Sequence, residues 1–433
     1  MRVVGLFSLL VATCGAQAPA TLPRQFREVI VVKAEPAETV SSMACTQKSV
    51  ARGSDGNWWL TIGRYLPKDE TTGRAERSSL ELWSSIDGVE WACAATVPMP
   101  RSGGASLVAD PDQPRLHLLW NAADKNGLSE PFYQAFDLER REWVGTATKL
   151  ATAVSGDDQY FASDLELAQN GALVAAIGSH SSPAGPPWNC GWSTAIRVLE
   201  PETVAWGPLQ QLNVASYGVA ANLHQNGNCI ESSYRTCPHD AVIAVRTYDA
   251  DKRAFVQDSD ESVSGAMAES FGIANTSLVC TDALGGRYVL HVYADHGPGR
   301  GKVRVAYAQP GDNEWRCTDV FDDEPIIRGN EHYSHFVLAR GSGNQMLAFY
   351  GKRSEQCEKL YQRTFDGGEC IGPEKLLMKD RPGAFAALCG NRQGVLKPGV
   401  QLVASRQGEA ASSGSVAVYG VLPSLLPTRR RAK

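Results

Sequence analysis

The feature that most constrains the fold is a repeat that runs along the chain. A hydrophobic strand, a polar turn, an aromatic or large apolar residue and a second strand recur in the same order. The turns are centred on Trp91, Trp143, Trp206, Phe255, Trp315 and Ile371. Successive centres are 52, 63, 49, 60 and 56 residues apart. Four-stranded blades of β-propellers repeat at such intervals. The sequence therefore predicts an all-β propeller with antiparallel blades.

A second series of segments supports this prediction. About thirty residues before the turns lie strands with alternating polarity, rich in β-branched and aromatic residues. They span residues 58–64, 116–121, 172–180, 288–296, 346–352 and 400–405. The fourth unit is harder to divide, because "NGNCIESSYRTCPHD" interrupts it. No long amphipathic helical pattern occurs, so we expect strands throughout.

The number of blades follows from the two ends of the repeat. Six full units run from about residue 40 to 378, and the C-terminal part holds three further strands without a fourth. The segment "REVIVVKAEP" is a lone strand before the first unit. We predict that residues 27–34 supply the outermost strand of the last blade and so close the ring. This gives seven blades in one domain over 27–423, with six blades as the alternative.

The N-terminal segment predicts export. Arg2 precedes a short apolar run over 3–11, and "AQA" at 16–18 is an A-x-A cleavage pattern, so residues 1–18 are expected to be a signal peptide. "LVATC" is also similar to a lipoprotein box, which makes a lipid anchor at Cys14 the alternative. No later apolar run reaches spanning length. We expect a secreted or extracytoplasmic protein with a basic, solvated tail over 424–433.

Cysteine content and charge narrow the partners. Ten cysteines remain besides Cys14, and an even number suits disulfides in an oxidising compartment, with open connectivity. No C-x-x-C occurs, which argues against a zinc site, and we expect neither metal nor cofactor. The net charge is −5 and no long basic stretch lies outside the tail. Nucleic acid is therefore not an expected partner.

One turn carries a recognisable motif. In "SSIDGVEW" (84–91), Ser85, Asp87, Gly88 and Trp91 resemble the Asp-box, or BNR repeat, of the sialidase superfamily, with one residue fewer between Asp and Gly. The resemblance implies that the Asp accepts backbone hydrogen bonds across the turn and that the Trp packs into the blade. It also implies that the turn lies on the face away from the active site. We interpret Asp87 as structural.

The catalytic residues of sialidases do not transfer to this chain. No Arg-Ile-Pro motif occurs, and neither the three arginines nor the Tyr–Glu pair can be matched. Seven blades also differ from the six of sialidases. We expect any site among two other sets of residues, the loops that lead into the innermost strands and the ends of the second strands.

These positions combine carboxylates, aromatic rings and cations, a mixture that suits sugar recognition. The candidate catalytic residues are Asp158, Glu269, Glu331, Tyr333 and His335. The candidate substrate-binding residues are Arg64, Tyr160, His180, Tyr217, His296, Lys352 and Arg406. Further polar residues at the same positions are Asn121, Asp157, Asp295 and His332.

Three functions fit this pattern, all with a glycan or glycoconjugate as partner or substrate. The first is an exported glycoside hydrolase with two of these carboxylates or a tyrosine nucleophile. The second is a polysaccharide lyase acting on uronates, because some seven-bladed propellers use His, Tyr and Arg for that reaction. The third is a propeller without catalysis that binds glycans or proteins at the cell surface. The fold alone does not choose among them.

Overall fold

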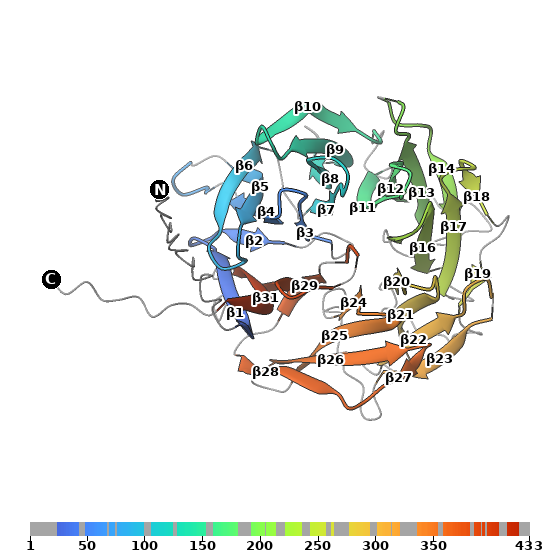
Figure 1. The fold of residues 1–433 in the computed structure, drawn as a ribbon. Coiled ribbons are helices and arrows are strands. Elements are labelled where there is room, and N and C mark those ends of the chain that lie inside the picture. Colours follow the sequence, from blue (N-terminus) through green and yellow to red (C-terminus); the bar gives the residue numbers. More distant parts are fainter. Residues whose placement is uncertain are drawn as a thin grey trace, which may run out of the picture.

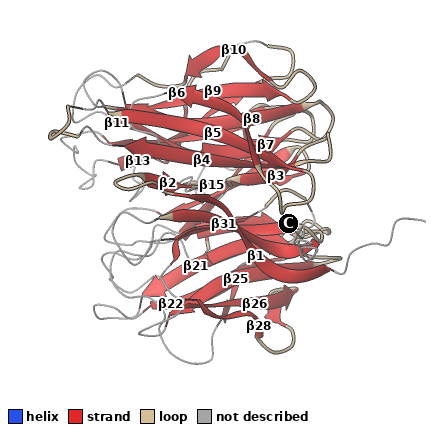
Figure 2. Cartoon of the chain, turned by 90° about the vertical axis from the view of Figure 1, so that its left-hand side faces the viewer, coloured by secondary structure: helices blue, strands red, loops and turns tan. Residues whose placement is uncertain are grey.

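The computed structural model is a ring of seven antiparallel sheets around a central axis (Figure 1). It describes residues 24–42, 48–66, 69–73, 76–98, 105–123, 128–152, 159–180, 192–203, 205–213, 221–235, 243–256, 261–263, 277–294, 301–312, 314–320, 336–353, 358–381, 385–390, 392–394, 396–406 and 414–423. Figure 2 shows the ring from the side, with strands and loops and no helix among these residues. Accordingly, no membrane-spanning helix occurs in the described part of the chain.

The first three blades follow the chain without a break in order. Blade 1 contains β2 (Thr39–Ser41), β3 (Val50–Arg52), β4 (Trp58–Leu66), β5 (Arg77–Ser85) and β6 (Ala92–Pro98). Blade 2 contains β7 (Ala105–Ala109), β8 (Arg115–Ala123), β9 (Ser129–Asp137) and β10 (Glu142–Lys149). Blade 3 contains β11 (Gln159–Leu167), β12 (Leu173–His180), β13 (Trp192–Leu199) and β14 (Gln210–Asn213).

The next three blades repeat this order. Blade 4 contains β15 (Asn222–Asn226), β16 (Cys229–Arg235), β17 (Ile243–Asp249), β18 (Ala254–Phe255) and β19 (Glu261–Ser262). Blade 5 contains β20 (Ser277–Thr281), β21 (Arg287–Ala294), β22 (Gly301–Ala308) and β23 (Arg316–Asp319). Blade 6 contains β24 (Phe336–Arg340), β25 (Gln345–Arg353), β26 (Glu358–Asp366), β27 (Glu369–Cys370) and β28 (Lys375–Arg381).

Blade 7 confirms the predicted closure of the ring. It contains β29 (Phe385–Gly390), β30 (Val400–Arg406) and β31 (Ser415–Pro423), and β1 (Arg24–Lys33) pairs antiparallel with β31 as the outermost strand. The prediction for residues 27–34 is therefore right in the partner strand and in its direction. The observed strand begins at Arg24, three residues before the predicted start. Seven blades are confirmed, and the six-bladed alternative is wrong.

Removing β1 should destabilise the ring. A variant that lacks residues 1–34 leaves the edge of β31 unpaired. It also loses Val32, which is 6% exposed in the core between blades 7 and 1. One such side chain contributes about 1.5–3 kcal/mol, and an open edge favours aggregation. We expect a lower melting temperature and increased light scattering on heating. A truncation of residues 1–23 is the control, and equal behaviour of the two truncations would contradict the closure.

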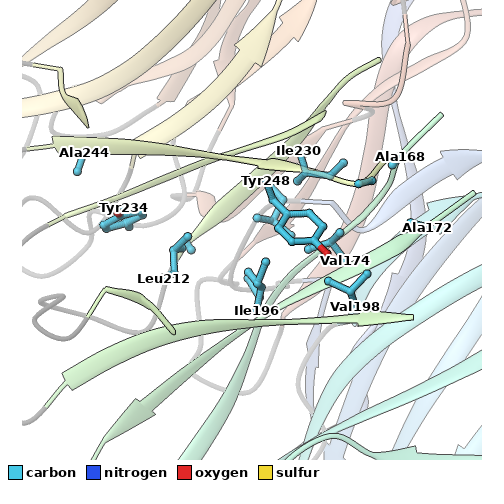
Figure 3. Packing of buried hydrophobic residues seen from close by; sticks show 14 residues of the cluster. Ala168, Ala172, Val174, Ile196, Val198, Leu212, Ile230, Tyr234, Ala244 and Tyr248 are labelled. Atoms are coloured by element: carbon cyan, nitrogen blue, oxygen red, sulfur yellow. The ribbon is translucent and has the colours of Figure 1, made fainter. Parts of the chain in front are cut away.

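The hydrophobic core lies in the seams between blades. Each of seven buried clusters contains side chains of two neighbouring blades. A strand in the middle of a blade is therefore covered on both faces, by one neighbouring blade on each side. Figure 3 shows the seam between blades 3 and 4, where Tyr248 of β17 packs among Val174, Ile196 and Val198. This packing explains the continuous apolar runs of the second strands. Polar side chains lie instead near the axis and on the two faces of the ring.

Two predicted repeat positions are wrong by one residue, since in blade 5 Tyr307 pairs with Arg316 and not with Trp315. Trp143 pairs with Phe136 and Phe255 pairs with Tyr248, but in blade 6 the residue paired with Phe365 is Cys370. Ile371 instead is 39% exposed. The cause is a two-residue turn, Gly367 and Gly368, with φ of 57° and 84°. Such a turn is shorter than the corners of the other blades.

The described cysteines do not support the expected disulfides. Cys93, Cys229, Cys280, Cys317 and Cys370 are all free thiols. The separation of first and fourth strands, about 14 Å at 4.8 Å per strand, excludes a bridge between Cys280 and Cys317 within blade 5. Cys45, Cys190, Cys237 and Cys357 lie outside the described residues, as do residues 1–18, Cys14, the side chain of Cys389 and the tail over 424–433.

Candidate active site on the upper face

The two faces of the ring carry different loops. We call the face where the innermost strands begin the upper face, and the face where they end the lower face. The loops into the innermost strands and the ends of the second strands lie on the upper face. The corners between third and fourth strands, including 86–91, lie on the lower face.

The lower corner at Asp87 is held by its own hydrogen bonds. Asp87 Oδ1 accepts the backbone N–H groups of Val89 at 2.8 Å and Glu90 at 3.1 Å. Trp91 Nε1 donates to the carbonyl of Gly88, and its ring packs against the core between blades 7 and 1. Gly88 has φ of 79°, and a Cβ there would meet Val400 at 2.8 Å. Ser85 Oγ accepts the backbone N–H of Gly88 at 2.9 Å, so each of the four motif residues has a local structural role.

Replacing Asp87 with alanine should cost stability without changing any ligand binding. The loss of its backbone hydrogen bonds should cost about 1–2 kcal/mol in urea unfolding. Partial burial opposes ionisation, but the Val89 and Glu90 N–H groups hold the pKa of Asp87 below its usual 3.8. A depressed pKa stabilises the fold above 3.8, and this contribution is lost as the pH falls through the lower, folded-state pKa. The difference between wild type and Asp87→Ala should therefore shrink below pH 3.8.

A shallow hollow adjoins this corner at the seam of blades 7 and 1. It has about 390 Å³ of open space and is lined by Arg52, Trp58, Ile86, Asp87, Pro398, Gly399 and Val421. The Arg52 guanidinium lies 5.1 Å from the Trp58 ring centroid. The only carboxylate of the lining is Asp87, whose Oδ1 is already committed to the turn. The hollow therefore lacks an acid–base pair for chemistry.

A buried ion cluster lies among the innermost strands next to β3 and is called the plug below. Lys48 Nζ lies 3.2 Å from Asp164 Oδ2 and 2.7 Å from Glu166 Oε2, and the side chains are at most 4% exposed. Nζ also donates to the carbonyls of Leu165 and Leu223. Because Asp164 accepts from Ser106 Oγ as well, the cluster ties blades 1 to 4 together.

A second group of buried polar residues continues this plug from blade 7. Arg392 donates to the carbonyl of Val279 and to Asn222 Oδ1, and the side chain of Gln393 bonds with the backbone of Ala109 in blade 2. The backbone N–H of Leu396 donates to the carbonyl of Arg340 in blade 6. These hydrogen bonds join blade 7 to blades 2, 4, 5 and 6 across the axis of the ring.

Arg64, predicted to bind substrate, already holds two carboxylates at the upper end of β4. Its Nη1 lies 2.6 Å from Glu38 Oε2 and its Nε lies 2.9 Å from Glu81 Oε1. Partial burial opposes the charge, but the hydrogen bonds to both carboxylates raise the pKa of Arg64. Trp83 Nε1 also donates to Glu81. The Arg64 side chain is 24% exposed, and its substrate-binding role stays a prediction.

Blades 2 and 3 bring further predicted residues together on the upper rim. Asn121 Oδ1 accepts the backbone N–H of Ala162 at 2.6 Å, which joins the end of β8 to the start of β11. Tyr160 packs partly against the core between these blades. The backbone of His180 ends β12 and pairs with Gln159, next to Tyr160. The backbones of Tyr160 and His180 therefore both lie at the upper edge of blade 3, in neighbouring pairs of the ladder.

Lys149 and Glu130 complete this rim, and the sequence analysis did not single them out. Lys149 Nζ lies 2.6 Å from Glu130 Oε2, with side-chain exposures of 37% and 3%. The same ammonium lies 5.7 Å from the Phe132 ring centroid. The sequence pattern that could have indicated this pair is an acid, Glu130, near the start of the third strand and a lysine, Lys149, at the end of the fourth strand of the same blade.

Two of the remaining predicted residues lie at upper strand ends, and ten lie outside the described residues. The backbones of Lys352 and Arg406 lie at the upper ends of β25 and β30, as predicted. The candidates outside the described residues are Asp157, Asp158, Tyr217, Glu269, Asp295, His296, Glu331, His332, Tyr333 and His335. Their roles stay predictions. No cluster of three or more metal-ligating side chains occurs within the described ranges.

Comparison with known proteins finds similarity in the fold and not in the sequence. No family model matches the sequence, and no curated protein matches it. Among solved structures, a PL25 ulvan lyase bound to an oligosaccharide of glucuronic acid and sulfated rhamnose matches with a TM-score of 0.59 and 13% identity, over 92% of this chain and 96% of the lyase. The α-L-arabinanase of Penicillium chrysogenum matches with a TM-score of 0.50 and 11% identity, over 94% and 100%.

A sialidase also lies among the similar structures. The Streptococcus pneumoniae sialidase NanB has a TM-score of 0.42 and 9% identity, over 97% of this chain and 71% of the sialidase. At these identities the comparisons show a propeller architecture that carbohydrate-active enzymes share. They do not show the Asp-box family, and the sialidase likeness is too low to support an argument about activity.

Proposed function

We propose that this protein is an exported polysaccharide lyase that binds an acidic polysaccharide at its upper face and cleaves it at a uronate. The observation that carries the proposal is the likeness to an ulvan lyase over nearly the whole length of both chains. Seven blades agree with the lyase hypothesis and disagree with the six blades of sialidases. Export is part of the proposal through the signal pattern of residues 1–18.

The proposed reaction is a β-elimination, and we assign its steps to residues of the upper rim. A base removes the proton from the carbon next to the uronate carboxylate, the bond to the leaving oxygen breaks, and a carbon–carbon double bond forms. The leaving oxygen takes up a proton. His and Tyr side chains serve such proton transfers, and a cation stabilises the charge that develops on the carboxylate. In this proposal His180 and Tyr160, on the strands at the upper edge of blade 3, transfer the protons, and Arg64 of blade 1 and Lys149 of blade 2 supply the positive charge.

A panel of polysaccharides with and without uronate tests the proposal. We expect products from the uronate polymers that carry the ultraviolet absorbance of an unsaturated uronyl end. New reducing ends without this absorbance would identify a glycoside hydrolase and contradict the lyase. Binding without new ends would identify a propeller without catalysis. The absence of both binding and cleavage across uronate-containing polymers would overturn the proposal entirely.

A further inference from the structure

His291 is a buried titratable side chain that the proposed function does not use. It lies on β21, the second strand of blade 5, and is 0% exposed. Neither of its ring nitrogens has a hydrogen-bond partner among the described residues. Val289, two residues earlier, belongs to the core between blades 4 and 5. Because alternate residues of a strand share a face, His291 faces the same seam.

The rest of blade 5 does not compensate a positive charge on this ring. His291 pairs with Arg304 on β22, and Arg304 pairs in turn with Asp319 on β23, so the three residues share one face. Arg304 Nε lies 2.7 Å from Asp319 Oδ1, which commits this carboxylate to another cation. Burial lowers the pKa of His291 to about 4; Arg304 adds to this shift, and the Val289 backbone and Asp319 oppose it. The ring is therefore neutral at pH 7.

Blade 4 presents a buried carboxylate to the same seam, at a different height. Glu231 of β16 is 2% exposed and accepts hydrogen bonds from two side chains of its own blade, at 2.8 and 3.1 Å. It pairs across the ladder with His224, whose Nε2 lies 3.4 Å from Cys280 Sγ. Cys280 is three residues, or about 10 Å of strand, beyond Ser277, the ladder partner of His291. Two further charged positions of blade 4, of opposite sign, are in register with this face, Arg235 and Glu261.

This seam also has the smallest apolar core in the described part of the ring. The buried side chains of each of the other six cores outnumber those of this one. Its members are Ile243, Val245, Val263, Val279, Val289 and Ala306. Since apolar burial holds neighbouring blades together, this seam loses the least when it opens.

We propose that the seam between blades 4 and 5 is an acid-sensitive joint of the ring, which opens when His291 takes up a proton. Protonation gives the ring a second N–H donor and a charge, and the described residues around it supply neither an acceptor nor an uncommitted carboxylate. Water reaches the charged ring only when the two blades separate. The neutral ring stabilises the fold above pH 6.5, and this contribution is lost as the pH falls toward 4. The joint does not rest on the proposed function.

Thermal unfolding of the full protein at about pH 7.5 and about pH 4.5 tests this joint. Between these values the melting temperature of the wild type should fall by about 3–6 °C more than that of His291→Gln. His224 is present in both proteins, so the comparison isolates His291.

His117→Gln is the matched control for this experiment. His117 is also buried on the second strand of its blade, but its Nδ1 lies 2.8 Å from the Tyr133 hydroxyl and its Nε2 lies 3.8 Å from Asp110 Oδ2. A protonated ring there has a carboxylate beside it. The His117→Gln variant should therefore keep the wild-type fall in melting temperature.

Amide hydrogen exchange of the wild type at both pH values gives a readout that does not depend on any variant folding. After correction for the intrinsic pH dependence of exchange, we expect protection to fall in acid at β17, β20 and β21, which line this seam. Protection should persist at β8, β9 and β12, which line the seam between blades 2 and 3. A uniform fall in all blades, or an equal drop in melting temperature for wild type and His291→Gln, would overturn the proposal.

Discussion

Replacing Lys48 with methionine should lower the free energy of unfolding by about 3–5 kcal/mol. The change leaves the carboxylates of Asp164 and Glu166, which are at most 4% exposed, without their cation. It also removes the hydrogen bonds that join blade 1 to blades 3 and 4 through Leu165 and Leu223. Guanidinium chloride unfolding of the two proteins, followed by tryptophan fluorescence, measures the difference.

A second lysine–aspartate pair provides the control for this experiment. Lys252 lies 2.7 Å from Asp249, but its side chain is 76% exposed. Lys252→Met should leave the unfolding midpoint unchanged, because solvent screens an exposed pair. The double variant Lys48→Met/Glu166→Gln should be more stable than Lys48→Met alone, since one uncompensated charge is removed. Equal stabilities of Lys48→Met and wild type would contradict the role of the cluster in holding the ring.

Replacing His180 with alanine should reduce the rate of uronate polysaccharide cleavage by about 10²–10⁴-fold. This prediction depends on the proposed function, in which His180, at the upper end of β12, transfers a proton during elimination. Tyr160→Phe should also lower the rate, because it removes the hydroxyl and keeps the ring that packs in the seam. Initial rates from the absorbance of the unsaturated product measure both effects.

The lower face supplies the control for these variants. Ile86 is 82% exposed in the corner that carries Asp87. Ile86→Ser should leave the cleavage rate unchanged, and all variants should keep the wild-type melting temperature. Full activity of both His180→Ala and Tyr160→Phe would remove the upper edge of blade 3 from the mechanism.

The architecture could be predicted from the sequence because its signals are local. Trp91, Trp143 and Phe255 mark corners that each blade builds from its own residues, and the lone strand near the N-terminus completes the three strands at the other end. The prediction failed at Ile371, where a two-residue glycine turn replaces a longer corner. Gly368 is required there, because a Cβ would meet Tyr307 at 2.5 Å.

The buried plug was missed because its charges come from strands that are distant in the sequence. "FASDLELA" places Asp164 and Glu166 in an innermost strand that alternates with apolar residues, an unusual place for acids. The cation that pairs with both of them, Lys48, is more than a hundred residues away in the sequence, and only the closed ring brings them together. Acids in a segment expected to be an innermost strand could therefore have predicted a buried cation beside them.

Amide hydrogen exchange with a bound glycan tests the central claim, that the upper face binds an acidic polysaccharide. The His180→Ala variant keeps the polymer intact during the measurement. We expect slower exchange at the upper ends of β8 and β11, around Asn121 and Ala162, which Asn121 Oδ1 joins. The lower corner over 85–91 should exchange at an unchanged rate. Protection confined to this corner and to the hollow at Arg52, with none on the upper rim, would contradict the account.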